Sequence, residues 1–254
     1  MIRTILARLH QKHRTTTYPD TEPVLPRHFR GRPLIDCSAC PATCSSCRDA
    51  CPTQAIGERD GTPEIDLGKC LFCTVCRDSC PEGSITFSRD HRLSVNSREA
   101  LLLQGDAELQ LAEQMAEELL RLYGRSFKLR EVSAGGCNAC EADTNVLSTI
   151  GFDLGRFGIQ FVASPRHADA IYVTGPVSEN MREALLQTYY AVPEPRLVIV
   201  AGACAISGGP FAGNPEQHNG VMGLLPVDLF IPGCPPHPLT ILDGLLRLVG
   251  RIRS

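Results

Sequence analysis

The stretch that decides the fold of this chain is Cys70-Leu-Phe-Cys73-Thr-Val-Cys76-Arg-Asp-Ser-Cys80-Pro81. It reads C-x2-C-x2-C-x3-C-P, so three thiols lie within seven residues and a fourth directly precedes a proline. Residues 37–81 hold nine of the thirteen cysteines of the chain. This density of thiols makes the region the first candidate for a metal-binding module.

The chain contains an internal repeat of this stretch. Pro33-Leu-Ile-Asp36 and Pro63-Glu-Ile-Asp66 are 30 residues apart, and from Cys44 onward the matching residues are 29 apart. The matched cysteines are Cys40 with Cys70, Cys44 with Cys73, Cys47 with Cys76, and Cys51 with Cys80. The first copy therefore has one extra residue before Cys44. Cys37 falls opposite Leu67, outside the pattern.

The spacing is the one that bacterial two-cluster ferredoxins use for [4Fe–4S] clusters. Three closely spaced thiolates wrap one corner of a cluster, and the fourth, followed by proline, ligates the other cluster. The predicted ligands are Cys40, Cys44, Cys47 and Cys80 for the first cluster, and Cys70, Cys73, Cys76 and Cys51 for the second. Disulfides would need an oxidising compartment, and no secretory signal precedes the motif. Zinc sites favour paired C-x2-C motifs instead.

Length and composition place few other limits on the chain. Its 254 residues predict one or two domains, and no run approaches the ~18 apolar residues of a membrane-spanning helix. Residues 1–33 carry seven Lys or Arg against two acidic residues, a charge of +5, so the rest carries −8 of the total −3. No Walker loop, dinucleotide fingerprint or nucleic-acid patch is present.

The basic N-terminal segment predicts a short amphipathic helix over residues 1–14. Ile2, Ile5, Leu6 and Leu9 follow helical spacing, and the basic residues lie mostly off that stripe. Such a helix can lie on a membrane surface with its arginines near anionic headgroups, or it can pack on a partner subunit. The proline-rich residues 15–36 predict an extended arm that lies along a partner.

The second half of the chain has α/β texture. Strands are expected at 127–132, 158–163, 169–174, 196–201 and 227–231, and helices at 141–150, 178–190 and 238–249. This alternation predicts a flavodoxin-like parallel sheet covered on both faces. We divide the chain into a helix and arm (1–34), a ferredoxin-like domain with two [4Fe–4S] clusters (35–90), a helical linker (91–125, with helix expected over 97–123) and this α/β domain (126–254).

The four remaining cysteines suggest a third metal site. They are Cys137, Cys140, Cys204 and Cys234, and each follows the end of an expected strand in a glycine-containing loop. Carboxyl ends of parallel strands meet at one edge of a sheet, so these loops can converge. Twelve ligands in three sets of four leave only Cys37 over. The sequence therefore predicts three [4Fe–4S] clusters.

Several motifs carry a resemblance to a known family. They are Gly135-Gly-Cys137-Asn-Ala-Cys140-Glu141, Ala163-Ser-Pro-Arg-His-Ala-Asp169, Ile171-Tyr-Val-Thr-Gly175-Pro176, Gly202-Ala-Cys204 and Gly233-Cys-Pro-Pro-His-Pro238. This half resembles the small subunit of membrane-bound, energy-converting [NiFe]-hydrogenases, a homologue of the 20 kDa subunit of complex I. The first half, with Thr16-Thr-Tyr-Pro19 and Phe29-Arg-Gly-Arg-Pro33, resembles the two-cluster ferredoxin-like subunit of formate hydrogenlyase and complex I. The two subunits, usually separate, are fused here.

The resemblance implies an electron-transfer subunit of an oxidoreductase complex. Its implied partners are a [NiFe]-hydrogenase-like large subunit, other subunits of a membrane-bound complex, and an electron donor such as a formate or CO dehydrogenase or a ferredoxin. The expected location is the cytoplasmic face of the plasma membrane. Complex I relatives usually carry two adjacent cysteines where this chain has Cys137-x2-Cys140, which favours the hydrogenase branch. A complex I-like subunit and a stand-alone ferredoxin-like carrier or scaffold are the alternatives.

Four further residues have two interpretations each. In hydrogenases, a glutamate placed like Glu141 is implicated in proton transfer, but a carboxylate there can simply stabilise a helix N-terminus. His237 can donate to a sulfur or a partner, or be a packed loop histidine. Arg166 and His167 can line a subunit interface or be solvated.

Overall fold

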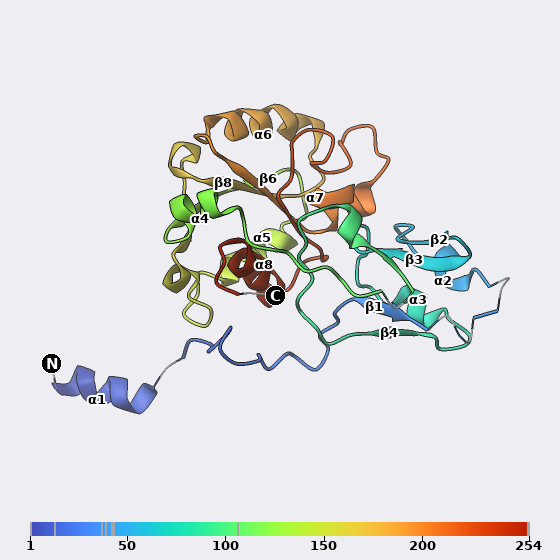
Figure 1. Ribbon diagram of the computed structural model, residues 1–254, viewed down its shortest axis with the longest axis horizontal. Coiled ribbons are helices and arrows are strands. Elements are labelled where there is room, and N and C mark those ends of the chain that lie inside the picture. Colours follow the sequence, from blue (N-terminus) through green and yellow to red (C-terminus); the bar gives the residue numbers. More distant parts are fainter. Residues whose placement is uncertain are drawn as a thin grey trace.

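The computed structural model describes residues 2–12, 14–36, 38, 40–41, 44–105 and 107–252. Cys37 lies outside the described residues. The cysteine-rich region lies at one end of the body and the parallel sheet at the other, and an N-terminal helix projects from the body (Figure 1). Among the described residues, no helix has the length and apolar character that a membrane crossing needs.

The cysteine-rich region is built on two small antiparallel sheets. In the first, β1 (Pro33–Ile35) pairs with β4 (Ile85–Phe87). In the second, β3 (Thr62–Asp66) lies between β2 (Ile56–Arg59) and β5 (Leu102–Gln104). The one-turn helices α2 (Ser46–Asp49) and α3 (Val75–Asp78) pack against each other. They occupy matching places in the two copies of the repeat.

The segment between the two halves is not helical over most of 97–123, where we expected helix. Glu99–Leu101 forms one 3-10 turn, β5 follows, and only α4 (Glu117–Tyr123) is α-helical. Leu101 and Leu103 are buried two residues apart, which is strand spacing. Further on, the amide of Ala112 donates to the Ser94 carbonyl and that of Met115 to the Leu248 carbonyl. These tertiary hydrogen bonds replace the helical ones.

The C-terminal half holds a five-stranded parallel sheet, as the sequence predicted. Its strands, in spatial order, are β7 (Ile159–Phe161), β6 (Phe127–Ser133), β8 (Ala170–Thr174), β9 (Leu197–Ala201) and β10 (Leu229–Ile231). In chain order this is 2-1-3-4-5, one of the two common orders of doubly wound sheets. All four pairings are parallel. The carboxyl ends of all five strands therefore meet at one edge.

Helices cover both faces of this sheet (Figure 1). On one face lies α6 (Glu179–Ala191), and on the other α5 (Ala139–Val146) packs against α8 (Pro238–Leu248). A short helix, α7 (Ala203–Ser207), follows β9 directly. The core beneath α6 continues into the cysteine-rich region, because Ile35, Ile56 and Leu67 belong to the same buried cluster as the sheet. The two halves thus share one hydrophobic core.

The junction between the halves is tightly packed. The Ser207 hydroxyl donates to the Gly68 carbonyl at 2.9 Å, and a Cβ on Gly68 would lie only 2.7 Å from the Ile206 side chain. The segment 88–96, here called the strap, leaves the cysteine-rich region and bonds to the sheet edge, since Val95 and Phe230 exchange both backbone hydrogen bonds. These contacts fix the cysteine-rich region against α7 and β10.

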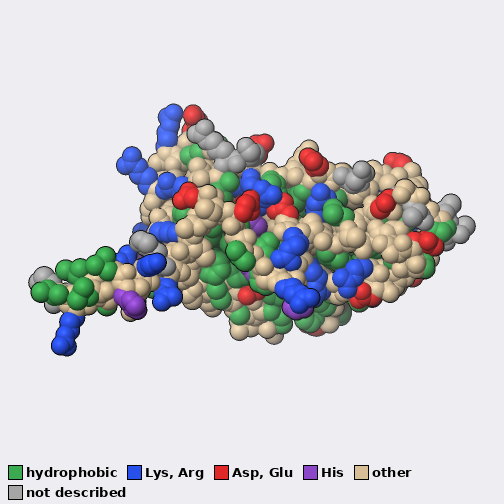
Figure 2. Space-filling model, turned by 90° about the horizontal axis from the view of Figure 1, so that it is seen from below, with side chains coloured by type: hydrophobic (Ala, Val, Ile, Leu, Met, Phe, Trp, Pro, Cys, Tyr) green, Lys and Arg blue, Asp and Glu red, His purple; other side chains and the backbone are tan. Residues whose placement is uncertain are grey.

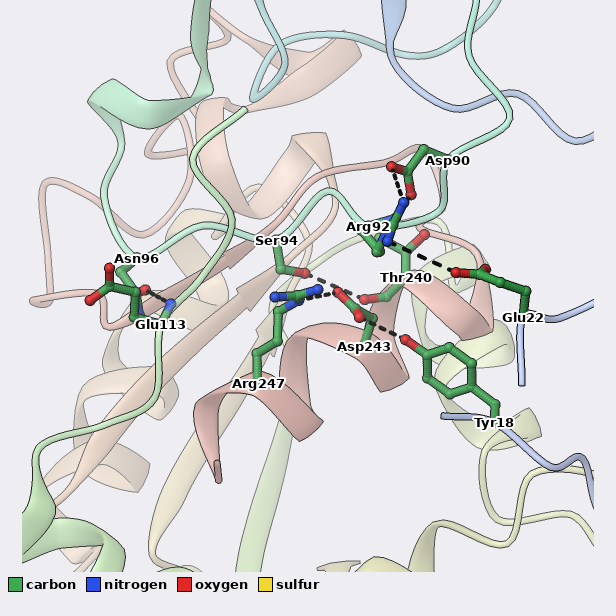
Figure 3. Close-up of polar contacts among 10 residues, drawn as sticks. All are labelled: Tyr18, Glu22, Asp90, Arg92, Ser94, Asn96, Glu113, Thr240, Asp243 and Arg247. Atoms are coloured by element: carbon green, nitrogen blue, oxygen red, sulfur yellow. Dashed lines mark hydrogen bonds and ion pairs between the residues drawn. The ribbon is translucent and has the colours of Figure 1, made fainter. Parts of the chain in front are cut away.

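The arm that we expected along a partner packs on its own body instead. Tyr18 is 7% exposed, and its hydroxyl donates to Oδ1 of Asp243 on α8 at 2.7 Å. The other carboxylate oxygen of Asp243 accepts from Nε of Arg247 at 2.8 Å. Figure 3 shows this buried network beside Ser94, whose hydroxyl donates to the Thr240 carbonyl. The network joins the arm and the strap to one helix.

Helix α1 (Ile2–Gln11) has no buried residue. Its four large apolar side chains, Ile2, Ile5, Leu6 and Leu9, are all more than half exposed. Figure 2 shows hydrophobic side chains gathered along the projecting segment with basic side chains beside them. The helix that the sequence predicted is therefore present, and its apolar face is uncovered.

Candidate iron–sulfur sites

The sheet pairings of the cysteine-rich region exchange cysteines between the two copies of the repeat. β1 precedes the first cysteine run and pairs with β4, which follows Cys80. β2 follows Cys51 and pairs with β3, which precedes the second run. Each pairing therefore carries the last cysteine of one copy to the loop of the other copy. This is the crossing that the Cys-Pro endings predicted.

The second group of thiols is partly enclosed: Cys76 is buried, Cys51 and Cys70 are half-buried, and Cys73 is exposed. Burial raises the pKa of Cys70 to about 12, and charges on Cys76, Cys51 and Cys73 raise it further. Burial likewise raises the pKa of Cys76 to about 11, with Cys73 and Cys51 again contributing. The structure thus brings together the four predicted ligands of the second cluster. As thiolates these four groups would repel one another, and bound iron would relieve that repulsion.

The backbone of the second group also suits bound sulfur. The amide of Phe72 donates to Sγ of Cys70 at 3.4 Å, and the amide of Ala55 donates to Sγ of Cys51 at 3.2 Å. Phe72 and Thr74 have φ values of 54° and 73°, which turn the loop tightly around its centre. Amide donors aimed at cysteine sulfur are a means by which proteins tune such clusters.

The first group is more open. Burial raises the pKa of Cys47, and charges on Cys80 and Cys44 contribute, so these three thiols are neighbours. Hydrogen bonds to Ser46 lower the pKa of Cys44. Cys40 is exposed, and its thiol donates to the Asp36 carbonyl at 3.7 Å. The structure brings three of the four predicted ligands together. The fourth, Cys40, is close to two of them in sequence and is exposed on the surface.

The third group forms at the carboxyl edge of the parallel sheet. Cys137 follows β6, Cys140 lies in α5, Cys204 in α7, and Cys234 follows β10. Burial raises the pKa of Cys140, and Glu141, Cys204, Cys234 and Cys137 raise it further. Burial also raises the pKa of Cys204 to about 11, with Cys234 and Cys137 contributing. The three loops therefore converge as the sequence predicted.

Two glycines leave room for the sulfur atoms of this group. A Cβ on Gly202 would lie 2.6 Å from Sγ of Cys140, and one on Gly209 would lie 2.9 Å from Sγ of Cys204. Gly202 also has a φ of 92°, which side chains rarely adopt. Any residue other than glycine at these two positions would place its Cβ too close to a cysteine sulfur. The donor set and its glycine-lined surroundings fit a [4Fe–4S] cluster.

The alternatives of disulfide and single-ion zinc sites can be compared with the geometry. All twelve cysteines that the structure describes are free thiols. Within the described ranges, no three His, Cys, Asp or Glu side chains form a group able to hold one metal ion. A four-iron cluster needs a different arrangement of ligands from a single metal ion, because each of its thiolates binds a different iron atom.

Glu141 lies in the first turn of α5 and is 6% exposed. Its Oε1 accepts from the hydroxyls of Ser133, at 2.5 Å, and Thr174, at 2.7 Å. The position suits a carboxylate at a helix N-terminus. It also places the carboxylate beside Cys140, so both interpretations of Glu141 fit the geometry.

The other predicted side chains have simpler surroundings. Nδ1 of His237 accepts from the Leu239 amide at 3.1 Å at the start of α8, its ring meets Phe29 edge to face, and burial lowers its pKa. This is a packed, capping histidine. Arg166 and His167 are both exposed on a 3-10 turn, Pro165–His167.

Sequence reasoning missed one ionisable group near the third site. Burial and the charge of Glu141 raise the pKa of Glu131 to about 7, and its Oε1 is buried without a hydrogen-bond partner among the described residues. Glu131 lies on β6 two residues after Leu129, on the face that packs under α5 and α8. The alternation Phe127, Leu129, Glu131 was the available signal, since it places a carboxylate on an apolar face.

Known proteins resemble this chain over about half of its length. Residues 137–248 match the family described as NADH ubiquinone oxidoreductase, 20 Kd subunit. A probable membrane-bound hydrogenase subunit of Pyrococcus furiosus is 37% identical over 150 residues, which is 59% of this chain and 90% of that protein. Formate hydrogenlyase subunit 7 of Escherichia coli is 40% identical over 140 residues, 55% of each chain. An NADH-quinone oxidoreductase subunit of Heliobacterium modesticaldum is 38% identical over 122 residues, 48% of this chain and 70% of that protein.

The matched region contains all four cysteines of the third group and four of the five strands of the sheet, since β6 precedes it. Members of the matched family bind a [4Fe–4S] cluster. The near-complete coverage of the Pyrococcus protein at 37% identity is far above what a shared fold alone requires. This chain therefore belongs to the family of the 20 kDa subunit of NADH ubiquinone oxidoreductase.

Proposed function

We propose that this protein is an electron-transfer subunit of a membrane-associated [NiFe]-hydrogenase complex of the formate hydrogenlyase type, with three [4Fe–4S] clusters. The observation that carries the proposal is the convergence of Cys137, Cys140, Cys204 and Cys234 at one sheet edge. Two of the relatives in which a matching region occurs are described as hydrogenase or formate hydrogenlyase subunits. In this proposal the chain is a fusion of a ferredoxin-like domain and a flavodoxin-like domain.

The clusters would supply one-electron transfer, and the chain's residues would position and tune them. Cys40, Cys44, Cys47 and Cys80 would hold the first cluster, Cys70, Cys73, Cys76 and Cys51 the second, and the sheet-edge cysteines the third. The charge of Cys73 is among those that raise the pKa of Cys234, so the second and third groups are neighbours. Electrons would pass along the three groups in that order. The third lies where a large subunit with the nickel–iron centre would dock.

Glu141 is the residue that we assign to proton movement in this proposal. Its carboxylate accepts hydrogen bonds from Ser133 and Thr174 and sits directly after Cys140. A proton leaving a partner's active site could be received there, within hydrogen-bond reach of two hydroxyls.

Helix α1 supports a peripheral position on the membrane. Its apolar stripe is exposed, and the first 33 residues carry a charge of +5. Basic amphipathic helices bind anionic lipid surfaces through both features. We therefore propose that the complex contacts the cytoplasmic face of the membrane partly through α1.

A complex I-like role in quinone reduction is the second candidate. The family match itself favours it, because the family is described by a subunit of NADH ubiquinone oxidoreductase. The Cys137-x2-Cys140 spacing favours the hydrogenase branch instead. Identifying the metal in the partner subunit distinguishes the two candidate functions better than identifying the electron donor does.

The test is to purify the native complex anaerobically, count iron and acid-labile sulfide, and assay nickel and hydrogen-dependent dye reduction. Three clusters predict about twelve iron atoms per chain. Cys234→Ala should abolish dye reduction while leaving the two other clusters reducible by dithionite, and Cys37→Ser is the matched control. A count near eight, or wild-type turnover in Cys234→Ala with the large subunit in place, would contradict the proposal. Quinone reduction without nickel would favour the complex I-like role.

A further inference from the structure

A cavity of about 490 Å³ lies where the second and third groups of thiols approach each other. Its wall includes Cys73 from one group and Cys234 from the other. If the proposed function is right, an electron that moves between the two clusters crosses beside this cavity. The side chains on its wall therefore experience, and act on, the charge of both clusters.

Arg30 reaches this wall from the N-terminal arm. Its Nη1 donates to the Phe72 carbonyl at 2.8 Å. Phe72 lies inside the loop between Cys70 and Cys73, and its own amide donates to Sγ of Cys70. Through Phe72, Arg30 is thus hydrogen-bonded to the loop that carries Cys70 and Cys73 of the second group.

The charge of Arg30 acts on Asp78, whose pKa is lowered mainly by a hydrogen bond from Arg77 and in part by the charge of Arg30. None of the ion pairs found among the described residues includes Arg30. Apart from the two cysteines, the other ionisable side chains on the wall are Asp143 and His237, and burial shifts the pKa of each toward its neutral form. The guanidinium is therefore the permanent cation of the wall.

We propose that Arg30 is a positioning residue that sets the reduction potentials of the clusters flanking this cavity. Reduction adds negative charge to a cluster, and a nearby cation stabilises the reduced form. The hydrogen bond to Phe72 fixes both the distance of the cation and the shape of the cysteine loop. The packing of the arm on the body is thereby coupled to electron transfer between the second and third clusters.

The test uses the full chain with its clusters, prepared anaerobically, and a redox titration monitored by EPR. Arg30→Gln can still donate one hydrogen bond but lacks the charge, so its second and third clusters should titrate at more negative potentials. Arg30→Lys keeps the charge and should restore potentials close to wild type. Arg32→Gln is the matched control, because Arg32 lies on the same arm and donates a single hydrogen bond, to the Ala107 carbonyl at 3.0 Å.

Ionic strength provides a second readout. Arg30 is exposed in this chain, so the difference between wild type and Arg30→Gln should shrink as salt shortens the Debye length from about 30 Å at 0.01 M to about 3 Å at 1 M. Equal potentials in wild type and Arg30→Gln at low salt would overturn the proposal. An equal shift in Arg32→Gln, or failure of Arg30→Lys to restore the potential, would do so too. A wild-type chain with no cluster signals would instead refute the proposed function.

Discussion

Replacing Tyr18 with Phe should make the N-terminal arm open from the body more often while the body stays folded. The ring would still pack, and only the hydrogen bond from the hydroxyl to Asp243 would be lost. Asp243 is fully buried, and its remaining partner is Arg247. Burial and the Asp243 carboxylate raise the pKa of Tyr18, so the hydroxyl stays protonated and able to donate.

The magnitude follows from the charge of the acceptor. A hydrogen bond to a buried charged group contributes about 1.5–3 kcal/mol, and we take about 2 kcal/mol. At 1.4 kcal/mol for each factor of ten, the arm should open roughly 30-fold more often. Hydrogen exchange measured by mass spectrometry reports this directly, because the Thr16 amide is protected by the Gly151 carbonyl.

Tyr190→Phe is the matched control, since Tyr190 is 68% exposed and far from the arm in sequence. It should leave exchange over residues 15–20 at the wild-type rate. Exchange within α8 should not change in either variant, which separates arm release from general unfolding. Wild-type protection of residues 15–20 in Tyr18→Phe would refute the reasoning.

Three further predictions concern other parts of the chain. Cys40→Ser should lose about four iron atoms per chain, and Cys37→Ser none, by iron count and EPR; the reverse result would make Cys37 the ligand. Deleting residues 2–11 should move the complex from the membrane to the soluble fraction with its iron content intact, because the exposed stripe of α1 would be gone; unchanged fractionation would favour packing on a partner. Glu131→Gln should remove a pH dependence of stability. Burial raises the pKa of Glu131 from 4.5 to about 7, so the folded wild type loses stability as pH rises through that window, and the variant should not. The urea midpoint should therefore fall more between pH 5 and pH 8 in the wild type than in the variant; an equal change in both proteins would contradict this.

The C-terminal sheet could be predicted from the sequence because its signals are local. Runs such as Leu197–Ala201 are apolar throughout and end at a glycine, which is typical of a buried parallel strand. The part of segment 97–123 before α4, residues 97–116, could not be predicted, because its apolar spacing also fits a helix. Pairing of Leu103 with Ile65 decides for a strand, and that partner lies far away in the chain. The docking of Tyr18 on Asp243 has no local signal either.

The candidate sites divide in the same way. Spacing grouped the cysteines of the second site, and their places after expected strand ends grouped those of the third, as the structure places them. Arg30 and Glu131 were not singled out. Arg30 acts through a contact 42 residues away in sequence, with Phe72. Contacts of that kind depend on the completed fold and leave no periodic pattern.

The bridge between Val95 and Phe230 has a consequence for how the two halves can exist. β10 is an outer strand of the sheet, and an unpaired outer strand is a template for aggregation with other chains. The strap occupies part of that strand. Because the strap is covalently attached, its local concentration is of millimolar order and does not fall on dilution. A C-terminal half cut free of the strap would leave β10 open to pairing with other chains, so the attached strap protects this edge of the sheet.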